Sequence, residues 1–206
     1  MDILRTTLLA ATMVTAGIGA STPQTLLAQQ PAMPKAAMST QQKIADAVSA
    51  APMAISGKAT VLDWPAMEGQ KPTVLRKGTN GWTCLPDMPT TDGRDPMCID
   101  EVWMNWVEAY TTKTTPKITK VGIGYMIAPG GSHGSNSDPY ATSMKADNHW
   151  AHHPPHIMIL VPDPKALEGV STDPHNGGPY VMFKGTPYVH IMAPITGATM
   201  MSMDHK

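Results

Sequence analysis

The segment His156-Ile157-Met158-Ile159-Leu160-Val161 and the two similar segments at 179–183 (PYVMF) and 187–191 (PYVHI) decide the fold of this chain. All three are rich in β-branched and aromatic residues, and prolines flank them, which is typical of strands. Lys184-Gly185-Thr186 separates the last two segments. A short connection containing glycine between two such segments predicts a β-hairpin. The C-terminal part of the chain is therefore expected to form antiparallel strands.

The same signals continue toward the N-terminus. We expect a helix from Ser39 or Thr40 to about Ala50, and a second from Ile99 or Asp100 to about Tyr110, because apolar residues recur at helical spacing in both. Further strands are expected at 58–64, 73–77, 82–84 and 118–128. Hairpin order with few helices predicts an α+β fold, with a mostly antiparallel sheet of about six strands and two helices packed on it.

Cys84 and Cys98 are the two cysteines of the chain. An even number of cysteines in an oxidising compartment predicts a disulfide, worth roughly 3 kcal/mol for a loop of this size. The spacing differs from the Cys-x-x-Cys of redox sites, so the bond is expected to be structural. The enclosed segment 85–97 (LPDMPTTDGRDPM) is expected to be irregular.

The first residues resemble a secretory signal peptide. Arg5 precedes an uncharged, mostly apolar segment, 6–20, that is too short for a stable membrane anchor. Cleavage is expected after Ala20 or Ala28, with the second site preferred. The predicted organisation is a signal peptide at 1–28, a flexible leader at 29–39, one globular domain at 40–197 and a Met/His-rich flexible tail at 198–206. The predicted location is periplasmic or secreted.

Charge and hydropathy exclude some classes of partner. The formal net charge is −1, and no run of basic residues occurs. Nucleic acids and anionic membranes need clustered Lys and Arg, so neither is an expected partner. The chain has no second apolar stretch near 18 residues, so no membrane span is expected after removal of the signal.

Half of the histidines lie within eight positions, at His149, His152, His153 and His156. Imidazole is a common ligand of zinc and copper, so these side chains are candidate metal ligands. Pro154-Pro155 excludes a helix here, and the whole stretch 129–155 is expected to be a long loop. The alternative interpretation is a polar loop whose histidines form hydrogen bonds.

The tripeptide His-Ile-Met occurs twice, at 156–158 and at 190–192, each time in an expected strand. Alternation places His and Met of each copy on one face. If the two strands were neighbours in register, His156, Met158, His190 and Met192 would form a soft ligand set that suits copper. The alternative is that the methionines fill the core. The tail, with Met200, Met201, Met203 and His205, is a further candidate soft-metal sequence.

Gly130-Gly131-Ser132-His133-Gly134 matches the Gly-x-Ser-x-Gly motif of hydrolases and follows an expected strand. No helix is expected directly after the motif, although the α/β-hydrolase fold requires one there. Asp163 or Asp173, followed by His175 or His190, would complete the order of a catalytic triad. A small hydrolase that uses Ser132 is therefore an alternative function.

Between about Ala50 and Pro194 lie the segments GTNGWTCLPD, DPMCIDEVWMNW, PHIMILVPDP and GGPYVMFKGTPYVHIMAP. In these segments the chain resembles a set of uncharacterised exported bacterial proteins. The resemblance implies a bacterial, periplasmic setting and a single domain, and it implies no activity, cofactor or catalytic residue.

The sequence thus favours an exported binding module over an enzyme. The expected ligand is a transition metal, copper or zinc, or a small molecule held by the 149–156 segment and the C-terminal hairpin. The alternatives are a small hydrolase that uses Ser132, and a structural or interaction protein of the envelope.

Overall fold

The computed structural model describes residues 37–67 and 69–195. The predicted signal peptide, leader residues 29–36 and the Met/His-rich tail lie outside the described residues. No helix in the described part of the chain is both long and apolar enough to cross a bilayer.

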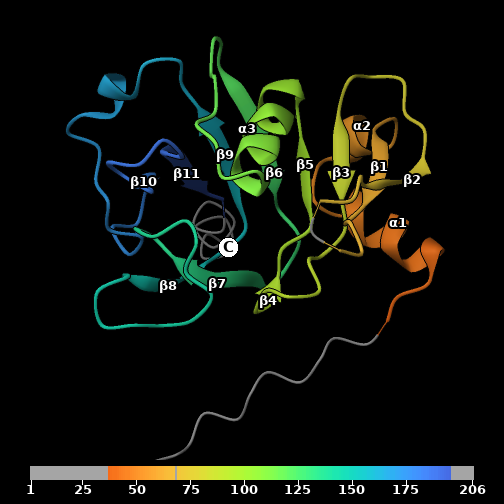
Figure 1. Ribbon diagram of the computed structural model, residues 1–206, viewed down its shortest axis with the longest axis horizontal. Coiled ribbons are helices and arrows are strands. Elements are labelled where there is room, and N and C mark those ends of the chain that lie inside the picture. Colours follow the sequence, from red (N-terminus) through yellow and green to blue (C-terminus); the bar gives the residue numbers. More distant parts are fainter. Residues whose placement is uncertain (1–36, 68, 196–206) are drawn as a thin grey trace, which may run out of the picture. The chain divides into compact units, whose positions relative to one another are not determined.

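The main element is a sheet with the strand order β10-β11-β9-β6-β5-β3-β1-β2 (Figure 1). All neighbouring strands are antiparallel except β1 and β3, which are parallel. The expected hairpin is confirmed, because β10 pairs directly with β11. The strands are β1 (Thr60–Asp63), β2 (Thr73–Arg76), β3 (Thr83–Leu85), β5 (Met97–Ile99), β6 (Gly122–Met126), β9 (His156–Leu160), β10 (Tyr180–Met182) and β11 (His190–Pro194).

The α+β class is confirmed, but the sheet has eight strands and is mixed, so the expectation of about six mostly antiparallel strands was wrong. The parallel pair has a simple cause. β2 turns back along the outer edge of β1, so the chain enters β3 on the other side of β1 in the same direction as β1. The sequence signals for single strands do not reveal on which side a strand will pair.

A second, three-stranded sheet, in the order β4-β7-β8, corrects two predictions of irregular structure. β4 (Gly93–Arg94) lies in the segment between the cysteines, and β7 (Gly131–Ser135) and β8 (Trp150–His153) lie in the expected loop 129–155. β7 contains two glycines, two serines and a histidine, which have low strand propensity. Its hydrogen-bonding partners β4 and β8 are distant in sequence, so local sequence signals could not predict the pairing.

Three α-helices occur among the described residues, one more than expected. α1 (Thr40–Val48) begins after Ser39, which forms a capping box with Gln42. α3 (Glu101–Thr111) begins after Asp100, whose side chain accepts a hydrogen bond from the backbone N–H of Trp103. The additional helix α2 (Met53–Ser56) is only one turn long, too short to show apolar periodicity. A 3-10 helix, η1 (Pro164–Leu167), follows β9.

Alternation along the strands produces two cores on opposite faces of the main sheet. Cys84, Cys98 and Val61 pack with α1 on one face, and Ile99, Met158 and Met192 pack with α3 on the other. The aromatic residues Trp103 and Trp106 of α3 are buried in this second core. In Figure 1, α3 lies over β9 and β6. The candidate site lies in the core beneath α3.

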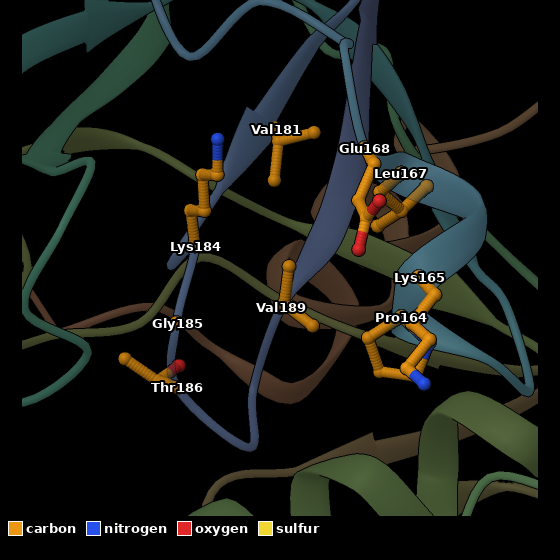
Figure 2. Close-up of a pocket in the computed structure, with 9 residues that line it drawn as sticks. All are labelled: Pro164, Lys165, Leu167, Glu168, Val181, Lys184, Gly185, Thr186 and Val189. Carbon is orange, nitrogen blue, oxygen red and sulfur yellow. The ribbon is translucent and has the colours of Figure 1, made fainter.

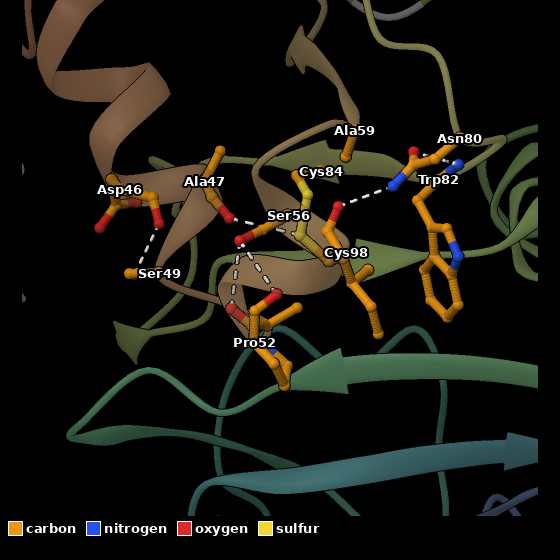
Figure 3. The surroundings of a disulfide bond; sticks show 12 residues. Asp46, Ala47, Ser49, Pro52, Ser56, Ala59, Asn80, Trp82, Cys84 and Cys98 are labelled. Atoms are coloured by element: carbon orange, nitrogen blue, oxygen red, sulfur yellow. Dashed lines mark hydrogen bonds between the residues drawn. A yellow bond between two sulfur atoms is a disulfide. The ribbon is translucent and has the colours of Figure 1, made fainter.

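The predicted disulfide is confirmed. Cys84 on β3 and Cys98 on β5 are directly opposite each other in the antiparallel pair, with 4.0 Å between their Cα atoms. Figure 3 shows the bond beside Ser56, whose hydroxyl donates to the carbonyl of Ala51. The disulfide therefore joins neighbouring strands and closes the segment that contains β4.

Candidate functional site

The four histidines of the 149–156 segment do not converge. Alternation along β8 exposes His152 and buries His153, and after the turn at Pro154-Pro155 His156 is buried as the first residue of β9. His149 is exposed, lies outside the strands and has a φ of 46°. The segment therefore divides its imidazoles between the surface and the core.

Both ring nitrogens of His153 have partners. Nε2 lies 3.3 Å from the carbonyl oxygen of Gly134, and Nδ1 lies 2.7 Å from the hydroxyl of Tyr180. A carbonyl only accepts hydrogen bonds, so Nε2 carries the proton and Nδ1 accepts from Tyr180. These hydrogen bonds occupy both nitrogens, so His153 links the small sheet to β10 and offers no lone pair to a ligand.

His156 differs in this respect. Its Nδ1 donates to the carbonyl of Pro154 at 2.6 Å, which leaves a lone pair on Nε2. Among the described residues Nε2 has no hydrogen-bond partner, and the residue is only 2 % exposed. A buried polar atom without a partner costs about 1 to 3 kcal/mol, and such atoms are rare in folded proteins. This nitrogen is therefore the strongest candidate for a ligand-binding atom.

The two His-Ile-Met copies are neighbours, on β9 and β11. The strands are antiparallel, so Met158 lies directly opposite Met192, whereas His156 lies opposite Pro194. His156 and His190 therefore flank the methionine pair from opposite ends of the strands, on the same buried face. The expected set of four is only partly brought together, because the antiparallel register separates the two imidazoles.

His190 lies among aromatic rings beneath α3. Its ring centroid is 5.1 Å from that of Trp103, 5.7 Å from that of Trp106 and 5.5 Å from that of Phe183. Its Nδ1 donates to the carbonyl of Tyr188 at 2.9 Å. This environment is apolar on most sides and fixes the ring tautomer.

Burial lowers the pKa of each of the three buried histidines to about 4. Removal from water disfavours the charged imidazolium at His153, His156 and His190. Each is also near another histidine, which lowers its pKa further. All three rings are therefore neutral at neutral pH, the form in which imidazole binds metals.

No group of three or more His, Cys, Asp or Glu side chains within residues 37–67 and 69–195 is arranged to hold a metal ion. The register places His156, Met158 and Met192 on one buried face of the β9–β11 pair. The sequence repeat indicated all three of these residues and also His190.

Ser132 lies within β7 and not at a strand-to-helix turn. It is directly opposite His153 in the small sheet, but both nitrogens of that histidine bind other groups. No hydrogen bond joins Ser132 to a histidine among the described residues. The geometry thus gives this serine no general base.

The sequence did not predict two further arrangements of polar side chains. His133 lies opposite His152, with Asp92 beside it. Asp95 is buried, and burial together with the neighbouring Asp87 raises its pKa to about 6. The sequence signals for the first arrangement were His152, already a candidate metal ligand, and His133 inside a segment interpreted as a loop.

A pocket of about 390 Å³ lies between η1 and the turn from β10 to β11. Figure 2 shows Val181 and Val189 with Lys184 on one side and η1 on the other. None of the predicted ligand residues lines it. The lining residues are Pro164, Lys165, Leu167, Glu168, Val181, Lys184, Gly185, Thr186 and Val189.

Comparisons with known proteins add no assignment. No family model matches the chain, and neither the curated proteins nor the solved structures include a significant match. The resemblance to exported bacterial proteins stays a prediction.

Proposed function

We propose that the protein is an exported binding module that holds copper(I) with His156, Met158 and Met192. The observation that carries the proposal is the buried lone pair on His156 Nε2, which has no partner among the described residues. A bound soft cation would give this nitrogen a partner. Without one, the buried lone pair lowers the stability of the folded chain.

The strand register supplies the other two ligands. Met158 follows His156 by two residues, so both side chains leave the same face of β9 as neighbours. Met192 is diagonal to His156 across the β9–β11 pair, because His156 is opposite Pro194. Diagonal neighbours have Cα atoms about 7 to 8 Å apart, within reach of long side chains. One nitrogen and two sulfurs can therefore approach a common point.

The residues around the methionines support this arrangement. Gly124 of β6 is opposite Met158, and a side chain at this position would meet Met158 Cε at 2.8 Å and Trp103 Nε1 at 3.5 Å. The Met158 methyl therefore occupies the space that a side chain at position 124 would need. The buried indole beside the thioether helps to exclude water from it.

The chemistry of the set selects the ion. Thioether and imidazole ligands suit copper(I) and do not suit magnesium or calcium. Because the pKa of His156 is about 4, its ring stays unprotonated in neutral and mildly acidic surroundings. His156 directly follows the half-buried turn Pro154-Pro155, so a local opening of this turn would admit an ion.

The test is a competition titration of copper(I) between the mature chain and a chromophoric copper(I) chelator. The buffer contains a mild reductant that keeps the copper as copper(I) but does not reduce the disulfide. Met158→Leu and Met192→Leu remove sulfur with little change in volume, so they should preserve the fold. Each should weaken copper(I) binding at least ten-fold, and the double variant should abolish stoichiometric binding.

The matched control is Met97→Leu. Met97 packs against the same core from β5, and two strand spacings, roughly 10 Å, separate β5 from β9. This variant should bind copper(I) as the unaltered chain does. Equal affinity in the unaltered chain and all four variants, or no binding in the unaltered chain, would contradict the proposal.

A further inference from the structure

The small sheet carries a pair of exposed histidines that the proposed copper site does not include. His133 of β7 and His152 of β8 are directly opposite each other, and their ring centroids are 5.0 Å apart. Alternation along β8 turns His152 to the outer face while its neighbour His153 points into the core. The pairing of β7 with β4 on its other side holds the strand in place.

Each ring has a partner on one nitrogen that leaves the other available. His152 Nε2 donates to the carbonyl of Gly130 at 2.9 Å, which leaves the lone pair on Nδ1. His133 Nδ1 is 3.5 Å from Asp92 Oδ2, and the backbone N–H of His133 donates to the carbonyl of Asp92. A proton on Nδ1 directed to this carboxylate leaves the lone pair on His133 Nε2. Metal-binding histidines usually have just such a carbonyl or carboxylate partner on the second nitrogen.

We propose that His133 and His152 together bind a divalent first-row transition ion such as zinc(II), nickel(II) or copper(II), with Asp92 as a positioning residue. Two imidazoles on rigid neighbouring strands provide two ligands, and water completes the coordination. The His133 side chain is 43 % exposed, so an ion reaches it without any opening of the fold. The site shares no residue with the copper(I) site, and its argument is independent of the proposed function.

Nickel(II) is the appropriate probe, because imidazole suits it and it is harder than copper(I), which prefers thioethers. Calorimetric titration of the mature chain at pH 7.5 should show one nickel(II) bound with micromolar affinity. His133→Ala and His152→Ala should each weaken binding at least ten-fold, since each leaves a single imidazole. Asp92→Asn should weaken it several-fold, because the carboxylate no longer orients the His133 ring.

His175→Ala is the matched control. His175 Nδ1 is also near a carboxylate, at 3.4 Å from Asp173 Oδ1, but no second imidazole faces it among the described residues. This variant should bind nickel(II) unchanged, and so should Met158→Leu, which separates this test from that of the copper(I) site. Unchanged affinity in His133→Ala, or an equal loss in His175→Ala, would overturn the proposal.

Discussion

At the residue scale, the dominant feature is the burial of neutral histidines. His153, His156 and His190 are each 3 % exposed or less, and burial lowers the pKa of each from 6.5 to about 4. Above pH 6.5 both the folded and the unfolded chain hold these rings neutral. Between pH 6.5 and 4 only the unfolded chain takes up protons. The stabilising contribution is therefore complete above pH 6.5 and is lost as the pH falls toward 4.

We therefore predict that the free energy of unfolding falls steeply between pH 7.5 and pH 5. The loss should be on the order of 2 kcal/mol per buried histidine at pH 5. Urea unfolding at a series of pH values measures it. His156→Leu should remove about a third of the pH dependence, whereas His175→Ala, at an exposed site, should leave it unchanged. A flat profile in the unaltered chain would contradict the burial of neutral rings.

Asp95 should have the opposite pH dependence. Burial, reinforced by Asp87, raises its pKa from 3.8 to about 6, so the folded chain binds this proton more tightly than the unfolded chain. Proton binding by Asp95 therefore contributes fully to the free energy of unfolding below about pH 4, and this contribution is lost as the pH rises through 6. We predict that Asp95→Asn gains stability relative to the unaltered chain by about 2 kcal/mol between pH 4 and pH 7. Urea unfolding of both proteins measures this difference, and a difference that does not vary with pH would contradict the assignment.

At the scale of elements, Asp100 joins α3 to the sheet. One carboxylate oxygen accepts from the backbone N–H of Trp103 at 2.9 Å, and the other accepts from that of Ile123 at 2.7 Å. Asp100→Ala should therefore cost about 2 kcal/mol or more, because it removes a helix cap and a contact to β6. Ser39→Ala, which removes only an exposed cap of α1, should cost about 1 kcal/mol or less. Equal losses in chemical denaturation would show that the bond to Ile123 contributes nothing.

Gly131 lies at the start of β7, where the backbone leaves no room for a side chain. Its φ is 72°, and a Cβ atom at this position would lie within 2.3 Å of the carbonyl oxygen of His153. Gly131→Ala should therefore cost more than 2 kcal/mol, since both backbone strain and a steric clash oppose it. Gly169 also has a positive φ, 84°, but has open space around it, so Gly169→Ala should cost only about 1 kcal/mol. Thermal unfolding compares the two, and similar losses would mean that the clash is relieved by movement of β8.

At the scale of the whole molecule, the sequence predicted the elements with strong local signals. The hairpin of β10 and β11, the helices α1 and α3, and the disulfide all follow from periodicity, capping residues and cysteine number. The small sheet was missed because Gly131–Ser135 has little strand propensity and pairs with distant segments. The short helix α2 and the mixed order of the sheet depend on packing that no local pattern records.

The sequence also predicted only those parts of the candidate site that follow from a local pattern. Alternation within each His-Ile-Met copy places His156 and Met158 on one face, and the sequence shows this directly. That Met192 opposes Met158 while His190 lies at the far end of the pair depends on antiparallel register, which the sequence did not specify. The pairing of His133 with His152 depends on strands that were not expected at all.

The most direct test of the central claim is X-ray absorption spectroscopy at the copper edge on the mature chain loaded with one equivalent of copper(I). The account predicts a first coordination shell with both nitrogen and sulfur scatterers, and loss of most of the sulfur contribution in the variant with both Met158→Leu and Met192→Leu. A shell of nitrogen or oxygen alone in the unaltered chain, or a spectrum that the double substitution does not change, would show that the buried imidazole and thioethers are not the ligands.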